Sequence, residues 1–297
     1  MKKVIFGFVL LIGLFTACEN ADNNPEDLKP SNATLWEISK DGKSIFLAGS
    51  VHLLRSQDYP MPAAFDYAYK KSSVLVLETD VDRMADPDIV EYMNEKFMLP
   101  EGQTLQTVLN EDVYKRLEKL IRPEYIEDII HYKPSVIVNE LERAAYNYFG
   151  FTENGADFYY IDKAKQDGKP LGFLEDVKVQ IDILSNMADG IENEYVSASI
   201  KGYPYSIGIS VITLVSEWKE GIATTTETSL NAEKEQWPSL YEITILNRNT
   251  AWIPEIETYL TTEPIEFIIV GMAHVYGPDG LLTQLRNKGY SIRQLVN

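Results

Sequence analysis

Short apolar runs near both ends of this 297-residue chain are the feature that most limits how it can fold. Residues 74–77 and 267–270 contain only Val, Leu, Ile and Phe, so a strand formed there is apolar on both faces. Such strands occur in sheets that helices cover on both sides, and these sheets are mostly parallel. Helical patterns separate the runs, and the longest of them lies in the middle of the chain. This alternation predicts an α/β fold with a mixed, largely parallel sheet, flanking helices and a helical insertion subdomain.

The pattern of apolar and turn-forming residues predicts the position of each element. Strands at 34–38 and 44–48 are joined by Asp41-Gly42, a dipeptide typical of tight hairpins. Further strands are expected at 73–77, 170–174, 265–270 and 290–296, and helices at 62–71, 157–167, 176–187 and 281–288. Helices punctuated by prolines are expected between 86 and 149, and most of 190–237 is expected to be helical. A last helical stretch, 240–260, should be interrupted at Pro254, because proline removes a backbone hydrogen bond.

The N-terminus has the pattern of a secretory signal peptide. Residues 1–17 combine a basic start with an apolar run from Val4 to Phe15, which is too short to span a bilayer. The chain's only cysteine, Cys18, follows directly, and Leu14-Phe15-Thr16-Ala17-Cys18 resembles a bacterial lipobox, in which the cysteine becomes a lipid-modified N-terminus. The alternative is an ordinary signal peptide with an incidental cysteine.

A lipidated Cys18 would anchor the protein in the cell envelope, with the outer membrane as the expected site. Residues 18–32 are rich in Asn, Asp, Pro and Glu and predict a disordered tether, which leaves 33–297 as the folded domain. Removal of residues 1–17 changes the formal net charge from −18 to −20, since 25 basic residues then face 45 acidic ones. Such a surface repels nucleic acid and anionic lipid. Nucleic acid is therefore not an expected partner.

Two segments 222 residues apart repeat the pattern Gly-x-x-His. They are Gly49-Ser50-Val51-His52 and Gly271-Met272-Ala273-His274, each of them follows a predicted strand, and the chain has only three histidines. Imidazole is the commonest metal ligand and the usual general base near neutral pH. The glycine permits unusual dihedral angles and close backbone approach. Each single histidine could be a hydrogen-bonded residue at a strand end, but the matched contexts favour a functional pair.

Two carboxylates occupy comparable positions after strands. Glu78 follows the strand at 73–77, and Glu175 follows the strand at 170–174, so in a parallel sheet both lie at the same edge as the histidines. Two imidazoles with one or two carboxylates can hold a zinc or manganese ion and leave a position for water, or one carboxylate can act as general base. The alternatives are that Glu175 is only an acid at a helix N-terminus and that Glu78 is simply exposed.

Three other residues combine a chemically useful side chain with a simpler structural interpretation. Asp157 lies at a predicted helix start, where an N-cap is the simplest interpretation. Arg248 is a candidate for pairing with carboxylates or binding an anionic transition state, and a solvated arginine is the alternative. His131 has no matched partner, and we interpret it as structural.

Several motifs follow one another in a recognisable order along the chain. They are Leu35-Trp36-Glu37-Ile38, residues 45–52, the strand ending in Glu78, Gly155-Ala156-Asp157, Gly172-Phe173-Leu174-Glu175, Arg248-Asn249 and residues 271–274. In this order they resemble the TraB/PrgY/GumN family, whose animal relatives include the Tiki proteases, over residues 33–296; Ser50 stands where the family usually has threonine. The resemblance implies a fold related to the erythromycin-esterase and ChaN-like group and a metal-dependent hydrolase of the peptidase type. It also makes His52, Glu78 and His274 the leading site residues, followed by Glu175, Asp157 and Arg248.

We therefore expect a lipid-anchored metallohydrolase of the cell envelope that acts on a peptide or another small molecule. His52, Glu78 and His274 would bind a divalent ion (zinc, manganese or cobalt), Glu175 would act as general base, and Arg248 would stabilise the oxyanion. The alternative is a non-catalytic lipoprotein that binds a peptide signal or a haem-like cofactor. A purely structural lipoprotein would leave the matched histidines unexplained.

Overall fold

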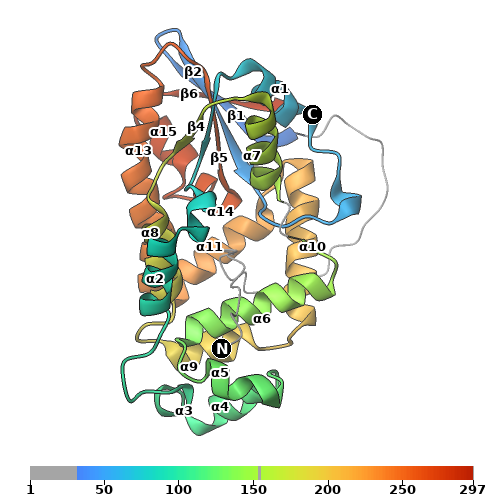
Figure 1. The fold of residues 1–297 in the computed structure, drawn as a ribbon. Coiled ribbons are helices and arrows are strands. Elements are labelled where there is room, and N and C mark those ends of the chain that lie inside the picture. The colour runs from blue at the N-terminus through green and yellow to red at the C-terminus, as the bar shows by residue number, and fades with distance from the viewer. Residues whose placement is uncertain (1–31, 153–154, 297) are drawn as a thin grey trace, which may run out of the picture. The chain divides into compact units, whose positions relative to one another are not determined.

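The computed structural model describes residues 32–152 and 155–296. These residues form a six-stranded mixed sheet with flanking helices, which confirms the predicted α/β fold (Figure 1). The predicted signal peptide, the Cys18 anchor and all of the predicted tether except Asn32 lie outside the described residues. None of the helices in these two ranges combines the length and the apolar character needed to cross a bilayer.

The described chain divides into two compact units. The helical unit consists of Asp80–Phe149 and Asp176–Ile209, and the sheet unit consists of residues 32–79, 150–175 without 153–154, and 210–296. The helical insertion expected from residue 86 to 149 is thus only the first segment of the helical unit, which a second segment of the chain completes.

In the sheet, five strands run in one direction and the remaining strand, the first in the chain, runs opposite to them. Its strands are β1 (Asn32–Lys40), β2 (Lys43–Ser50), β3 (Val74–Leu77), β4 (Leu171–Phe173), β5 (Glu266–Gly271) and β6 (Ser291–Val296), in the order β4-β3-β5-β2-β1-β6. Strands β4, β3, β5 and β2 run parallel, and β1 pairs antiparallel with β2 and β6. The β1–β2 hairpin turns at Asp41 and Gly42, whose φ angles of 52° and 81° are those expected of a tight two-residue turn.

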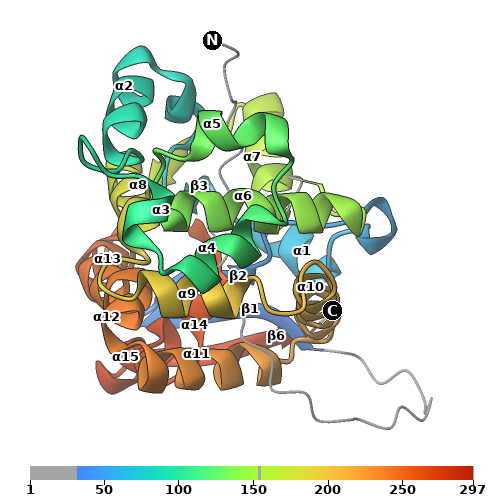
Figure 2. The same cartoon turned by 90° about the horizontal axis from the view of Figure 1, so that it is seen from below.

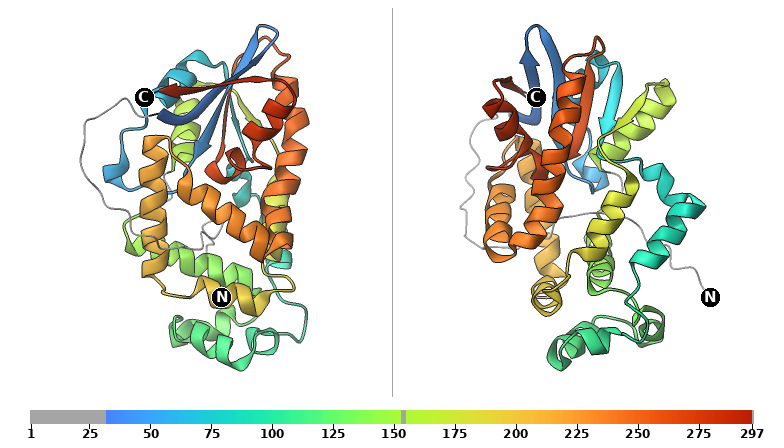
Figure 3. Two further views of the ribbon diagram at one scale, coloured as in Figure 1. Left: turned by 180° about the vertical axis from the view of Figure 1, so that it is seen from behind. Right: turned by 90° about the vertical axis from the view of Figure 1, so that its left-hand side faces the viewer.

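Helices cover both faces of this sheet, as the apolar strands predicted. On one face, Ile268 and Val270 of β5 belong to a buried cluster with side chains of α13 (Asn247–Tyr259) and α15 (Leu281–Asn287). On the other face, the ring of Phe267 lies 6.0 Å from Phe65 of α1 (Ala63–Lys71) and 5.7 Å from Tyr160 of α7 (Ala156–Asp167). The right-hand view of Figure 3 shows α13 and α7 on opposite sides of the strands.

The remaining helices of the sheet unit lead up to α13. Helix α10 (Tyr205–Glu220) enters this unit at Ser210, and α11 (Thr224–Gln236), α12 (Pro238–Tyr241) and a π-helical turn (Glu242–Leu246) follow. The expected interruption at Pro254 is wrong, because α13 continues through this residue. Pro254 and Thr250, whose carbonyl loses its usual partner, are both exposed, so water can solvate the freed carbonyl.

The helical unit is built from short helices around α6. Its helices are α2 (Pro87–Lys96), α3 (Leu105–Val108), α4 (Glu111–Glu118), α5 (Ile126–Ile129), α6 (Pro134–Tyr148), α8 (Val177–Asn186) and α9 (Glu192–Ser199). Helix α6 packs against α8 and α9, and α4 also contacts α9 (Figure 2). Pro87 and Pro134 each occupy the first turn of a helix, where a missing backbone N–H costs nothing.

Candidate active site

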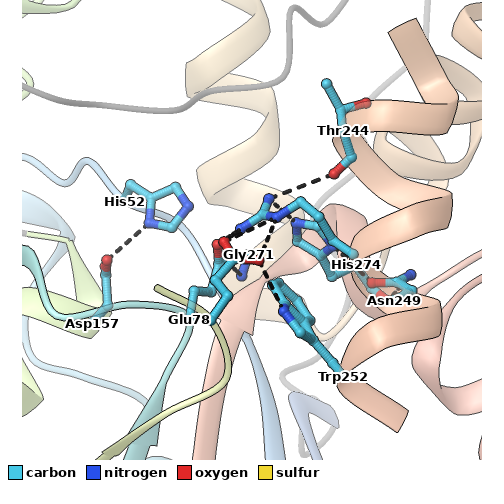
Figure 4. A network of polar contacts seen from close by, with 10 residues as sticks. His52, Glu78, Asp157, Thr244, Asn249, Trp252, Gly271 and His274 are labelled. Atoms are coloured by element: carbon cyan, nitrogen blue, oxygen red, sulfur yellow. Dashed lines mark hydrogen bonds and ion pairs between the residues drawn. The ribbon is translucent and has the colours of Figure 1, made fainter. Parts of the chain in front are cut away.

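Four of the predicted site residues follow the carboxyl ends of neighbouring parallel strands. His52 follows β2, Glu78 follows β3, Glu175 follows β4, and His274 lies in α14 (Met272–Val275), directly after β5. Since β4, β3, β5 and β2 are adjacent and parallel, these ends meet at one edge of the sheet. Figure 4 shows the side chains of His52, Glu78 and His274 converging there, in the sheet unit, as the sequence predicted.

Gly271 leaves the space around which the donor atoms gather. A Cβ atom at this position would lie 3.2 Å from His52 Nε2, 3.4 Å from Glu78 Oε1 and 3.8 Å from His274 Cδ2. The backbone of Gly271 has an ordinary φ of −57°, so the value of glycine here is close approach and not the unusual dihedral angle that we expected. The Gly271 N–H also donates to Glu78 Oε1 at 2.6 Å, which fixes that carboxylate beside the strand end.

The guanidinium of Arg248 forms the centre of the cluster, and its five N–H groups all have acceptors. Nε donates to both oxygens of Glu175 at 3.1 Å, and Nη2 donates to Glu175 Oε1 at 2.6 Å and Glu78 Oε2 at 2.5 Å. Nη1 donates to His274 Nε2 at 2.7 Å and faces the carbonyl of Thr244 at 3.5 Å. A guanidinium has five donors in a planar fork, so Arg248 has no N–H left for another ligand in this structure.

The position of Arg248 follows from local structure on two sides. It lies in the first turn of α13, directly after the π-helical turn that contains Thr244, and such turns are frequent at functional sites. Trp252, one helical turn later, places its ring 4.6 Å from the Arg248 guanidinium carbon and donates from Nε1 to Glu175 Oε2 at 2.9 Å. Glu175 therefore accepts hydrogen bonds on both oxygens and holds Arg248 in place.

Hydrogen bonds of Asn249 determine where His274 carries its proton. The Asn249 Nδ2 group donates to the carbonyls of His274 at 3.1 Å and Asp279 at 2.9 Å, so its Oδ1 must be the atom that faces His274 Nδ1 at 2.8 Å. The imidazole therefore donates from Nδ1 and keeps a lone pair on Nε2, which accepts from Arg248. Burial and the Arg248 charge lower the pKa of His274 to about 3, which keeps the ring neutral.

Asp157 orients the other histidine. Its Oδ2 lies 2.9 Å from His52 Nδ1, which leaves His52 Nε2 facing the space at Gly271 (Figure 4). The N-cap role expected of Asp157 is wrong, because Gly155 is the N-cap of α7 and makes no side-chain cap. A Cβ at Gly155 would lie 2.2 Å from the His52 carbonyl carbon, so only glycine lets this helix start approach His52.

The charges of the cluster shift the pKa values of its members in opposite directions. Burial lowers the pKa of His52, but the Asp157 and Glu78 carboxylates outweigh it and raise the pKa to about 9. Burial raises the pKa of Glu78, but Arg248 and the nearby histidines outweigh it and hold the pKa at about 2. Burial raises the pKa of Glu175 against the opposing effect of Arg248. At neutral pH the centre thus combines a protonated His52 with an ionised Glu78.

The structure brings together all five predicted site residues, His52, Glu78, Glu175, Arg248 and His274. The sequence analysis did not predict the roles of Asn249 and Trp252. The signal that could have found them is their spacing, since they follow Arg248 by one and four residues. His131 lies in the helical unit, where its Nδ1 faces the Gln103 carbonyl at 3.4 Å.

The donor atoms fit a divalent metal ion in type, since two imidazoles and a carboxylate are common ligands of hydrolytic zinc. Two of these donors, on His52 and Glu78, also meet at the space beside Gly271. However, His274 Nε2 and Glu78 Oε2 hold the Arg248 guanidinium. Within residues 32–152 and 155–296, no three His, Cys, Asp or Glu side chains are placed so that they could share a metal ion as they stand.

Several known proteins are similar to this chain. The chain is 33% identical over 98 residues to "Metalloprotease TIKI1" of Xenopus tropicalis and 34% identical over 107 residues to the human protein of that name. These matches cover 32% and 34% of this chain but only 18% and 20% of the TIKI1 proteins. The "Uncharacterized protein YbaP" of Escherichia coli K12 is 23% identical over 255 residues, which cover 84% of this chain and 91% of YbaP. No solved structure matches the chain. The pattern of the TraB/PrgY/gumN family extends over residues 34–294, from the first strand of the sheet to the last, and the chain therefore belongs to the TraB/PrgY/gumN family.

Proposed function

We propose that this protein is a hydrolase of peptide bonds whose centre is the cluster around Gly271. The observation that carries the proposal is the convergence of His52 Nε2 and Glu78 Oε1 on the space beside Gly271, with the His274 ring on a third side. Buried, oppositely charged groups with strongly shifted pKa values are typical of catalytic sites. The name metalloprotease, given to the partial relatives TIKI1, supports the same reaction class.

His52, Glu78 and His274 are the residues that would hold a divalent ion such as zinc, manganese or cobalt. A bound ion of this kind polarises a carbonyl and lowers the pKa of a bound water. The chain orients its two histidines for the task, since Asp157 leaves His52 Nε2 facing the centre and Asn249 leaves the lone pair of His274 on Nε2. At neutral pH a bound ion would have to displace the proton from His52 Nε2, because the metal-free ring is protonated.

Glu175 and Arg248 support this centre from one side. Both oxygens of Glu175 are engaged by Arg248 and Trp252, so Glu175 can act as general base only if one of these bonds is released. Arg248 can bind a substrate oxyanion only by giving up one of its five acceptors. We therefore assign Glu175 the role of positioning Arg248.

We further propose that the protein acts in the cell envelope, tethered through a lipidated Cys18. The signal-peptide pattern of residues 1–17 and the lipobox-like sequence support this location. A peptide or another small molecule in the envelope would then be the substrate.

The test is elemental analysis of a soluble form that starts at Glu19, beside its His52→Ala/His274→Ala variant. We expect near-stoichiometric metal in the parent protein and its loss in the variant, followed by cleavage of peptides in a mixed library by the parent alone. Full metal content in the variant would refute the ligand assignment. If neither protein holds metal after incubation with zinc, manganese or cobalt, the non-catalytic binding role for a peptide or haem-like ligand becomes the better explanation.

A further inference from the structure

The buried, positively charged guanidinium of Arg248 contacts the donor atoms that a metal ion would need. Its side chain is 2% exposed, and it contacts two of the three proposed metal ligands, Glu78 and His274. We infer that the guanidinium is the resident cation of the site and that a divalent ion binds only when Arg248 releases His274 and Glu78. This inference rests on the proposed metal site and concerns its regulation.

His274 makes the two occupants mutually exclusive. A neutral imidazole has one lone pair that can bind a cation, and Asn249 places it on Nε2 by accepting a hydrogen bond from the Nδ1–H group. In this structure Arg248 Nη1 takes that lone pair at 2.7 Å. A metal ion that uses His274 Nε2 must therefore displace the Nη1–H group.

Glu78 is shared in a less exclusive way. Its Oε1 accepts from the Gly271 N–H and its Oε2 accepts from Arg248 Nη2, so the guanidinium neutralises the carboxylate that would attract a divalent ion. A buried carboxylate needs a counter-cation, which the arginine supplies while no metal is bound. The same carboxylate can pass from one cation to the other without becoming unpaired.

The structure provides Arg248 with an anchor that such an exchange would leave intact. Its Nε edge donates to both oxygens of Glu175, which is outside the proposed ligand set and is itself held by Trp252 Nε1. The carbonyl of Thr244, which already faces Nη1 at 3.5 Å, could accept a shorter hydrogen bond from that group. Arg248 can thus turn Nη1 toward the π-helical turn and release Glu78 from Nη2 while Nε stays on Glu175.

The experiment measures binding of Mn²⁺ and Zn²⁺ alone to the full-length protein by isothermal titration calorimetry. The variants are Arg248→Lys and, as a matched control in the same unit, Arg55→Lys, which alters the Arg55–Asp58 ion pair. Lysine keeps the positive charge but its single ammonium group cannot span the acceptors of a planar fork. If the guanidinium occupies the donors in at least nine of ten molecules, Arg248→Lys binds metal about tenfold more tightly or better, while Arg55→Lys matches the parent protein.

The outcomes separate the inference from the metal site itself. Metal binding by Arg248→Lys that is tighter than in the parent protein, or that occurs only in the variant, supports the inference. Equal affinity in the parent protein and in folded Arg248→Lys overturns it and leaves the metal site standing. Absence of binding in every protein overturns the metal site and the inference with it.

A second measurement needs no variant and covers the case in which Arg248→Lys does not fold. In protein labelled with ¹⁵N-arginine and ¹⁵N-histidine, metal addition should shift the His274 Nε2 signal and change the Arg248 Nη1–H signals. The Arg248 Nε–H signal should persist, because Glu175 still holds that edge. Metal binding that leaves the Nη1–H signals unchanged would overturn the exchange.

Discussion

At the scale of single residues, the centre depends on Gly271, because glycine has no side chain to fill the space between the donor atoms. Gly271 has a backbone conformation that alanine also adopts, with a φ of −57° and a ψ of 142°. A methyl group there would lie 3.2 Å from His52 Nε2 and 3.4 Å from Glu78 Oε1, at the place where these two donors meet. The requirement for glycine is therefore one of the site and not of the fold.

Gly271→Ala should abolish metal binding and hydrolysis while lowering the unfolding temperature only slightly. The matched control is Gly172→Ala in β4, whose added Cβ would be equally crowded, 3.2 Å from Tyr259 Oη and 3.3 Å from Val76 Cγ2, but touches no donor of the centre. The measurements are the metal content of both variants by elemental analysis and their unfolding temperatures, and we expect only Gly271→Ala to lose the metal. A Gly271→Ala protein that keeps its metal and activity would show that the space beside this residue is not used.

In the metal-free protein, the charge on His52 predicts a pH-dependent effect of Asp157. Because Asp157 and Glu78 raise the folded-state pKa of His52 from 6.5 to about 9, the protonated ring stabilises the fold below about pH 6.5, and this stabilisation is lost as the pH rises through about 9. Asp157→Asn removes the largest attractive contribution. The variant should unfold at a lower temperature than the parent protein. The difference between the two unfolding temperatures should be largest near pH 6 and should disappear toward pH 10.

The control for this prediction is Asp66→Asn, which also removes a partly buried acceptor, since Asp66 Oδ1 accepts from the Tyr160 hydroxyl at 3.1 Å. Its effect should not vary over the same pH range, because no histidine is involved. A gap for Asp157→Asn that is constant from pH 6 to pH 10 would contradict the ion pair.

At the scale of helices and strands, the sheet and its functional edge were predictable. Residues 74–77 and 267–270 are apolar on both faces and could only be buried between two layers of helices, as they are in β3 and β5. The parallel arrangement then put the residues after β2, β3, β4 and β5 at one edge. His52, Glu78, Glu175 and His274 were predicted by this route.

The contacts within the centre were not predictable, because they depend on how α13 is rotated and displaced relative to the strand ends. Nothing in the order Arg248-Asn249 tells which acceptors the guanidinium reaches, or that Asn249 faces His274. The π-helical turn before α13 has no recognised residue pattern, and the exposed face of Pro254 emerges only from packing. The order of elements along the chain also gives no indication that two separate segments, Asp80–Phe149 and Asp176–Ile209, form one unit.

The π-helical turn is tied to α11 by a buried acid, which predicts a second pH effect. Glu233 Oε1 lies 3.0 Å from the Thr244 hydroxyl, and burial raises the pKa of Glu233 from 4.5 to about 7 although Thr244 opposes it. Between these two values the folded protein holds a proton that the unfolded chain releases, so stability falls as the pH rises from about 4.5 through about 7.

Glu233→Gln removes this dependence, so its unfolding temperature should rise relative to the parent protein between about pH 5 and pH 8. Glu235→Gln, on the exposed face of the same helix, is the control and should follow the parent at every pH. If Glu233→Gln and the parent protein respond equally to pH, Glu233 does not carry the proton.

At the scale of the whole molecule, different parts of the chain are expected to provide the active centre and the attachment to a membrane. Every residue of the centre belongs to the sheet unit, although β3 and β4, which precede Glu78 and Glu175, are separated along the chain from α13 and β5 by the second helical segment, Asp176–Ile209. The attachment to a membrane is expected to depend on a part of the chain outside the described residues.

Cys18→Ser should move the protein from the membrane to the soluble fraction. With residues 1–17 removed, 25 basic residues face 45 acidic ones, so anionic lipid repels the protein, and none of the described helices could cross a bilayer. Acyl chains on Cys18 would supply the apolar area that stable anchoring requires. The measurement is the distribution of the protein after high-salt washing of membranes, with the mass of the N-terminal peptide to identify the lipid. Asn20→Ala, two residues away, should stay in the membrane, and a Cys18→Ser protein that stays there too would show that another part of the chain is the anchor.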